Sequence, residues 1–186
     1  MITSSIIAPP EVMFRSGQGL VLSPDGSHLA FIGRDADETD SLWIRPLDSR
    51  KARRVQESTG AYYPFWSPDS RWIGFTVDDS ILKVATEGGE PLQIIRHHDG
   101  FGSGTGLSWG EGGRIVFTAG QGAIYEVSDR GGTASLLLGP EPEIEQDLHD
   151  PQLLPGGRGI LFVVHRILEG GTPRNTGGRP FRRGAP

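Results

Sequence analysis

Hydrophobic residues along this chain alternate with polar ones or form short runs that end at polar, glycine-rich breaks. The segments SHLAFIG (27–33) and RWIGFTV (71–77) are examples, and each predicts a buried or half-buried β-strand. No stretch shows the 3.6-residue period of an amphipathic helix. The 28 glycines and 14 prolines are typical of a chain that turns every few residues. The pattern therefore predicts an all-β fold.

A ten-residue phrase repeats along the chain. LSPDGSHLAF (22–31) recurs almost unchanged as WSPDSRWIGF (66–75), and weaker copies end at Phe117 and Phe162. The four terminal phenylalanines are spaced by 44, 42 and 45 residues. A regular period of this length indicates a structural repeat.

Each repeat contains two turns. Ser-Pro-Asp-Gly (23–26) fits the four positions of a type I turn, and the Asp25 carboxylate can accept hydrogen bonds from nearby amides. A second turn follows between the last two strands of the repeat, at Gly-Gly in two of the repeats (88–89 and 131–132). Two turns of this kind predict four strands per repeat, and four-stranded units of this length are β-propeller blades. We expect about three full blades of antiparallel strands and a partial fourth.

The expected organisation has three parts. They are an N-terminal segment with a candidate closing strand (1–16), the propeller repeats (17–165, divided at about 17–58, 59–100, 101–142 and 143–165), and a basic tail rich in Gly, Pro and Arg (166–186). In the tail 13 of 21 residues are Gly, Pro or Arg. That composition is typical of a disordered tail and also of a GC-rich gene read out of frame, and both interpretations stay open.

The motifs SPDG, LWIRPLD (42–48), YPFWSPDS (63–70) and GGEPLQI (88–94) resemble the TolB-like propeller family, a relative of WD-repeat propellers. The likeness covers residues 17–162, and it is greatest to propellers attached to bacterial serine/threonine kinases of the eukaryotic type. The resemblance implies a sensing or scaffold module that binds a protein or peptide. TolB-like propellers usually have six or more blades, so we also expect self-association through open blade edges.

Charge and composition exclude several classes of partner. Residues 1–165 carry 13 basic against 22 acidic side chains, which argues against a nucleic-acid surface. The sequence has no apolar run long enough for a membrane helix, no cysteine and no signal peptide, and the compartment stays open between cytoplasm and periplasm.

The aromatic cluster Ala61–Trp66 is the candidate binding surface. Tyr62 and Tyr63 precede a strand, where the chain should approach one face of a propeller, and Trp66 ends the cluster. Exposed aromatic side chains on a rigid face are common binding anchors. We therefore predict Tyr62, Tyr63 and Trp66 as protein-binding residues.

Other candidate sites have simpler structural explanations. Asp25 and Asp69 hold equivalent turn positions, which explains both without acid–base chemistry. GFGSGTG (100–106) matches neither a Gly-x-Ser-x-Gly nucleophile turn nor a phosphate loop. The pair His97–His98 beside Asp99, and His149 between Asp147 and Asp150, are expected in polar loops and not in metal sites.

The sequence thus predicts a non-catalytic interaction or sensing module, without cofactor or metal, from the propeller region of a kinase-linked signalling protein. Two alternatives remain. One is a propeller fragment of a prolyl-oligopeptidase-like hydrolase, and the other is a self-contained TolB-like scaffold.

Overall fold

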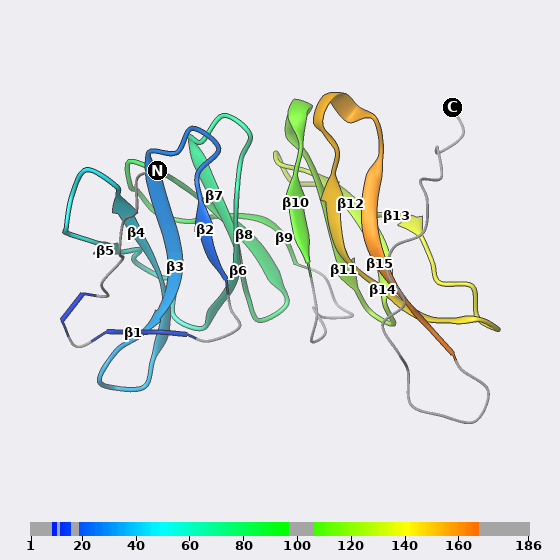
Figure 1. Cartoon of the computed structure of the whole chain (residues 1–186), viewed down its shortest axis with the longest axis horizontal. Helices are drawn as coiled ribbons and strands as arrows, with labels where there is room; N and C mark the ends of the chain where they lie inside the picture. Colours follow the sequence, from blue (N-terminus) through cyan, green and yellow to red (C-terminus); the bar gives the residue numbers. More distant parts are fainter. Residues whose placement is uncertain (1–8, 11, 16–18, 97–105, 168–186) are drawn as a thin grey trace, which may run out of the picture. The chain divides into compact units, whose positions relative to one another are not determined.

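The protein consists of antiparallel β-sheets joined by short turns (Figure 1). This computed structural model describes residues 9–10, 12–15, 19–96 and 106–167. The strands are β1 (Met13–Phe14), β2 (Leu20–Leu22), β3 (His28–Arg34), β4 (Asp40–Pro46), β5 (Arg53–Arg54), β6 (Ala61–Trp66), β7 (Trp72–Val77), β8 (Ser80–Ala85), β9 (Leu92–Arg96), β10 (Leu107–Trp109), β11 (Arg114–Ala119), β12 (Ala123–Ser128), β13 (Ser135–Leu138), β14 (Glu145–Leu153) and β15 (Ile160–Arg166).

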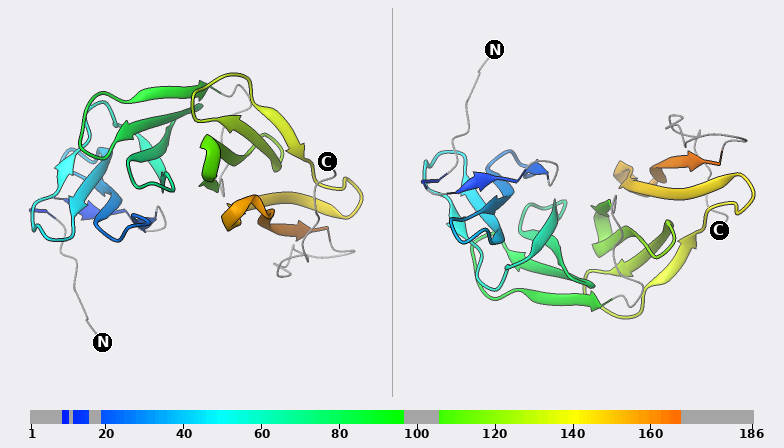
Figure 2. Two further views of the ribbon diagram at one scale, coloured as in Figure 1. Left: turned by 90° about the horizontal axis from the view of Figure 1, so that it is seen from above. Right: turned by 90° about the horizontal axis from the view of Figure 1, so that it is seen from below.

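The sheets follow the predicted repeats. The first has the order β1-β3-β4-β5 with β2 also paired to β3, the second β6-β7-β8-β9, and the third β10-β11-β12-β13. The fourth contains β14 and β15 alone, which lie side by side in both views of Figure 2. Three full blades and a partial fourth, all antiparallel, confirm the predicted fold class. Among the described residues the only helices are short 3₁₀ turns, η1 (Glu111–Gly113) and η2 (Pro155–Gly157), and none is long and apolar enough to cross a membrane.

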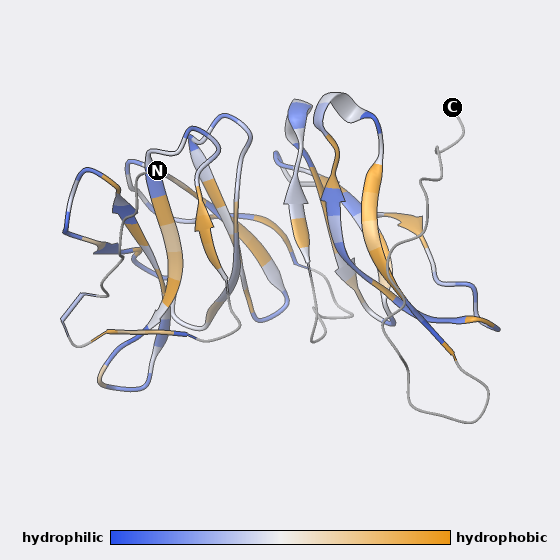
Figure 3. Cartoon of the chain, in the orientation of Figure 1, coloured by the Kyte–Doolittle hydropathy of each residue, from blue (hydrophilic) through white to orange (hydrophobic). Residues whose placement is uncertain are grey.

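The repeated phenylalanines form the centre of the blades. Phe31, Phe75 and Phe117 are at most 1% exposed, whereas Phe162 in the two-stranded sheet is only partly buried. Figure 3 shows hydrophobic residues along β3 and β15, where the surrounding turns are polar. The buried phenylalanines explain why the repeat keeps its period, since each fills the same position in its own sheet.

The chain divides into two compact units. Unit 1 contains residues 1–77 and 84–91, and unit 2 contains residues 78–83 and 92–186. In unit 1 the strands β2, β3 and β4 contact β6, and in unit 2 the strands β10, β11 and β12 contact β14. Each unit therefore packs one sheet against the first strand of the next repeat.

The N-terminal segment contributes one short strand. Met13 and Phe14 of β1 pair with Arg34 and Gly33 of β3, and the Phe14 ring meets the ring of Phe31 edge-on at 4.9 Å. This part of the segment extends the first sheet, while residues 1–8 and 168–186 lie outside the described chain. Closure of a propeller by the N-terminal segment stays a prediction.

Candidate functional site

The two best copies of the repeat form matching turns in unit 1. The amide of Gly26 donates to the carbonyl of Ser23 at 2.8 Å, and the amide of Ser70 donates to the carbonyl of Ser67 at 3.0 Å. These bonds close the predicted four-residue turns. The fourth residue has positive φ in both, 72° for Gly26 and 60° for Ser70, so Ser70 adopts a conformation that suits glycine better.

Each turn fixes its aspartate with hydrogen bonds. One carboxylate oxygen of Asp25 accepts from the Ser23 hydroxyl at 2.6 Å, and from the Ser27 amide and hydroxyl at 3.0 and 2.7 Å. Asp69 accepts from the Ser67 hydroxyl at 2.6 Å and the Arg71 amide at 3.1 Å. The bond from the neighbouring serine hydroxyl is the main cause that lowers the pKa of both carboxyls below the ordinary value of 3.8. Both carboxylates are therefore fixed anions near neutral pH.

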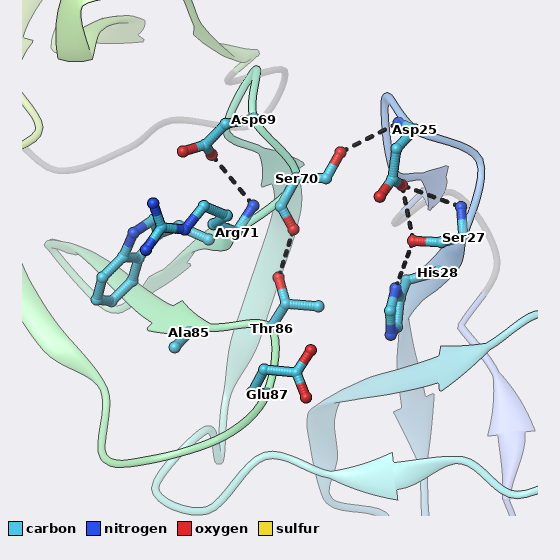
Figure 4. Close-up of a pocket in the computed structure, with 10 residues that line it drawn as sticks. Asp25, Ser27, His28, Asp69, Ser70, Arg71, Ala85, Thr86 and Glu87 are labelled. Carbon is cyan, nitrogen blue, oxygen red and sulfur yellow. Dashed lines mark hydrogen bonds between the residues drawn. The ribbon is translucent and has the colours of Figure 1, made fainter.

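A pocket of about 370 Å³ lies between these turns, and we call it the SPD pocket (Figure 4). The Asp25 amide donates to the Ser70 hydroxyl at 3.1 Å, and the Thr86 hydroxyl donates to the Ser70 carbonyl at 2.7 Å, so three segments of unit 1 are joined. The lining residues are Asp25, Ser27, His28, Asp69, Ser70, Arg71, Trp72, Ala85, Thr86 and Glu87.

The charges of the SPD pocket favour a cationic ligand. Asp25, Asp69 and Glu87 contribute three carboxyl groups, against the single guanidinium of Arg71. The remaining ionisable side chain is His28, whose Nδ1 lies 2.7 Å from the Ser27 hydroxyl. The turn carboxylates can attract a positive group, but they are poorly suited to proton transfer because their protonated forms are disfavoured.

The structure separates the predicted aromatic residues. Tyr62 and Tyr63 are partly exposed near the start of β6, with ring centroids 6.4 Å apart. Trp66 lies at the other end of the strand, is 8% exposed, and its indole N–H donates to the Val21 carbonyl at 3.1 Å. Trp66 thus joins the first and second repeats, while the two tyrosines remain available at the surface. A binding role for the three residues stays a prediction.

Two β-bulges interrupt the strand pairing, one at Tyr63 and one at Asp150. The pairing of β6 with β7 shifts between Tyr62 and Phe65, and Tyr63 has a φ of 49°. The pairing of β14 with β15 shifts between His149 and Gln152, and Asp150 has a φ of 51°. In both repeats a proline follows the residue with positive φ. Bulges of this kind are over-represented beside functional sites.

One group of potential metal ligands occurs in the described part of the chain. Asp147, His149 and His165 each offer a ligand atom, and these atoms lie within 4.8 Å of one another. The sequence predicted His149 in a polar loop, but the residue lies within strand β14, and nothing in its spacing pointed to His165. His165 reaches the group because Asp147 and His165 are paired across the strands.

Several predicted features lie outside the described residues. They are His97, His98, Asp99 and residues 100–105 of the GFGSGTG segment. The sequence also missed Thr86 and Glu87 as pocket residues. They follow β8 and enter the pocket only through tertiary packing, so no local motif could have revealed them.

Comparison with known proteins supports the fold. No protein family model matches the chain. Among curated proteins, it is 29% identical over 107 residues to the uncharacterized protein YidR of Escherichia coli, covering 52% of this chain and 26% of YidR. It is 26% identical over 151 residues to the uncharacterized peptidase YuxL of Bacillus subtilis, covering 77% of this chain and 21% of YuxL. The chain thus spans about a quarter of the length of each relative.

Three solved structures show the same fold. The TolB protein of Agrobacterium tumefaciens superposes with a TM-score of 0.61 at 18% identity, covering 78% of this chain and 52% of that one. Puromycin hydrolase superposes with a TM-score of 0.62 at 16% identity, covering 80% of this chain and 25% of the hydrolase chain. The β-propeller domain of Cps50 (Swd1) from Myceliophteria thermophila superposes with a TM-score of 0.58 at 13% identity, covering 84% of this chain and 51% of that one. The chain therefore has the blade architecture of TolB-like and WD-repeat propellers.

Proposed function

We propose that this chain is a non-catalytic protein-interaction module whose SPD pocket binds a basic side chain of a peptide or protein partner. The observation that carries the proposal is the ionisation state of the two turn carboxylates. Asp25 and Asp69 are held as anions by serine hydroxyls and backbone amides, which suits charge recognition and opposes general acid–base chemistry.

Aromatic side chains of unit 1 also support recognition. The lining of the SPD pocket combines acidic groups with the indole of Trp72, and Tyr62 and Tyr63 are partly exposed on β6 of the same unit. Aromatic side chains contribute contact area at little cost in conformational entropy, and carboxylates give specificity for a cation. We therefore assign the pocket to a lysine or arginine of the partner, and the tyrosines, at the other end of β6, to a separate part of the same partner.

Selection from a random peptide library against the 186-residue chain tests this proposal. We expect the enriched peptides to carry lysine or arginine. Substitution of Glu87 by Gln should lower the affinity for the best peptide about fivefold, as measured by fluorescence anisotropy. One negative charge of the pocket is lost, while the turn hydrogen bonds stay intact. Raising the salt concentration should weaken binding as well.

Asp79→Asn provides the matched control. Asp79 is exposed and pairs with Arg96 at 3.5 Å, outside the SPD pocket, so its loss should leave the peptide affinity unchanged. Enrichment of acidic or purely apolar peptides would overturn the pocket assignment. Equal weakening by Glu87→Gln and Asp79→Asn would do the same, because it would indicate a general charge effect.

A second candidate function follows from two of the comparisons. YuxL is described as a peptidase and puromycin hydrolase as a hydrolase, and the chain matches a part of each. The propeller could accordingly be the non-catalytic part of such an enzyme. A hydrolase frame with a Gly-x-Ser-x-Gly motif in the flanking DNA would favour this second candidate.

The proposed link to a kinase rests on the sequence resemblance alone. A kinase frame directly upstream, with further SPDG repeats downstream, would support a receptor-like arrangement. Flanking DNA with neither a kinase nor a hydrolase frame would favour a separate scaffold protein, whose partner the peptide selection would then identify.

A further inference from the structure

We propose that His149 and His165 bind a divalent transition metal, with zinc as the best fit, through their Nε2 atoms. The two histidines belong to the β14–β15 hairpin of unit 2, whereas the turns that form the SPD pocket belong to unit 1. This site is independent of the proposed function, so each can fail without the other.

Strand pairing places the ligands on one face of the hairpin. Asp147 lies directly opposite His165, and His149 is two residues further along β14, so the three side chains share a face. The intervening residues Leu148 and Val164 face the other way and are at most 2% exposed in a hydrophobic cluster. The buried face fixes the register, and the polar face is left partly open to solvent.

The distance between the imidazoles fits a shared metal ion. The two Nε2 atoms are 3.2 Å apart and the ring centroids 4.4 Å apart. Two nitrogens bound to one tetrahedral zinc at the usual bond length lie about 3.3 Å apart. Metal-free neutral rings meet at this distance only if one Nε2 carries a proton, because two lone pairs would otherwise face each other.

A carboxylate lies beside Nδ1, the second ring nitrogen, of each histidine. Asp147 Oδ1 lies 2.9 Å from His165 Nδ1, and Asp150 Oδ2 lies 2.9 Å from His149 Nδ1. Metal-binding histidines usually donate their other N–H to such a carboxylate, which fixes the tautomer. Each histidine can bind a metal through Nε2 when its proton is on Nδ1. In both rings a carboxylate oxygen lies beside that Nδ1 atom.

The hydrogen bonding of Asp147 is incomplete without that tautomer. Asp147 Oδ1 is buried and accepts no aligned hydrogen bond in the described structure, although His165 Nδ1 is close. A proton on Nδ1 and a small rotation of the His165 ring would complete the bond. Metal binding would therefore satisfy a buried acceptor as well as the facing Nε2 atoms.

The positive φ of Asp150 has a role in this arrangement. The bulge between His149 and Gln152 places the Asp150 carboxylate beside the histidine that precedes it. An ordinary strand would send neighbouring side chains to opposite faces. The backbone conformation of Asp150, with a φ of 51°, is the local feature that allows the contact.

The ligand atoms select the kind of metal. Imidazole nitrogens suit zinc, copper and nickel, whereas magnesium and calcium prefer an all-oxygen shell. The protein supplies two nitrogens, so water or a ligand from another molecule completes the coordination. Affinity should be weaker than in four-ligand structural zinc sites.

Zinc titration of the ¹⁵N-labelled 186-residue chain tests the site on the unmutated protein. Long-range ¹H–¹⁵N spectra should show that zinc shifts the Nε2 signals of His149 and His165 and leaves both Nδ1 atoms protonated. His28 should be unchanged, and magnesium at the same concentration should cause no shift. Zinc shifts confined to His28, His97 or His98 would overturn the proposal, as would equal shifts with magnesium.

Variants separate the ligands from the carboxylates that orient them. By calorimetry, His149→Ala and His165→Ala should each lower zinc affinity at least tenfold, and Asp150→Asn by about 10- to 100-fold. Asparagine tolerates positive φ, so the last change should preserve the bulge. The double variant His97→Ala/His98→Ala is the control and should bind zinc as before. Unchanged affinity in both His149→Ala and His165→Ala would refute the site.

Discussion

The backbone amide of Asp25 donates a 3.1 Å hydrogen bond to the hydroxyl of Ser70, a residue 45 positions further along the chain. Both residues belong to copies of the same turn, so the repeated sequence motif forms a direct contact between two repeats. Ser70 also accepts at its carbonyl from Thr86, which follows the third strand of its sheet. Ser70 therefore connects the two turns with the segment that follows β8.

Replacing Ser70 by Ala should destabilise the protein by about 1 kcal/mol, because the partly buried Asp25 amide loses its acceptor. Alanine and serine are similarly strained at the φ of Ser70, so the strain cancels in the comparison. Urea unfolding followed by circular dichroism would measure the change. Ser135→Ala, on an exposed position of β13, is the control and should be neutral. Equal stability of the two variants would contradict the role of Ser70.

Substitution of Gly74 by Ala should cost about 1–3 kcal/mol. An added Cβ would lie 2.2 Å from the Phe65 ring, which packs on Gly74 across β6 and β7. Gly139→Ala is the matched control, since nothing lies within 4 Å of its Cβ position. If the clash is the cause, Phe65→Leu should cost less in the Gly74→Ala background than in the wild type. Additive effects in this double-mutant cycle would argue against it.

The stability lost when a repeated phenylalanine is replaced by leucine should follow how deeply that phenylalanine is buried. Phe75→Leu should destabilise by about 1–2 kcal/mol because Phe75 is completely buried, and Phe162→Leu should cost less than about 0.5 kcal/mol because Phe162 is only partly buried. Thermal unfolding of the two variants provides the comparison. A larger loss for Phe162 would mean that the fourth repeat is packed as tightly as the second.

Stability should fall in acid partly through Asp40. This carboxylate is 6% exposed and pairs with Arg34 at 2.8 and 2.9 Å, and the Arg34 hydrogen bond lowers the pKa of Asp40 below 3.8. Because the folded state holds the proton less tightly than the unfolded state, the stabilisation is full above the unfolded pKa. It is lost as the pH falls below about 4.

Asp40→Asn should therefore destabilise the protein near pH 7, on the order of 2 kcal/mol, and by much less near pH 3. Melting temperatures across this range would show it. Asp25 and Asp69 titrate with the same sign, so part of the acid sensitivity should remain in the variant. A constant difference between the variant and the wild type at every pH would disprove the assignment to Asp40.

The sequence predicted the fold well because its signals are local. The order Ser-Pro-Asp-Gly specifies a turn by itself, and the period of Phe31, Phe75 and Phe117 follows from one buried position per blade. The predicted strands 27–33 and 71–77 agree with β3 and β7 within about one residue.

The sites were harder to predict because they depend on tertiary contacts. Trp66 looked like a surface aromatic, but its indole hydrogen-bonds to Val21 in the preceding repeat. His149 and His165 are separated by a turn, and their Nε2 atoms meet only through the register of β14 and β15 and a bulge that the sequence does not reveal. Strand pairing of this kind is visible only in three dimensions.

The most direct test of the proposed function is a ¹³C NMR titration of the carboxyl groups of Asp25 and Asp69. The proposal depends on both groups being fixed anions that attract a cation, and it predicts that both titrate below the ordinary pKa of 3.8. A carboxyl that titrates well above this value would contradict it. Such a group could exchange protons near neutral pH, and the SPD pocket would then have to be considered a candidate catalytic site.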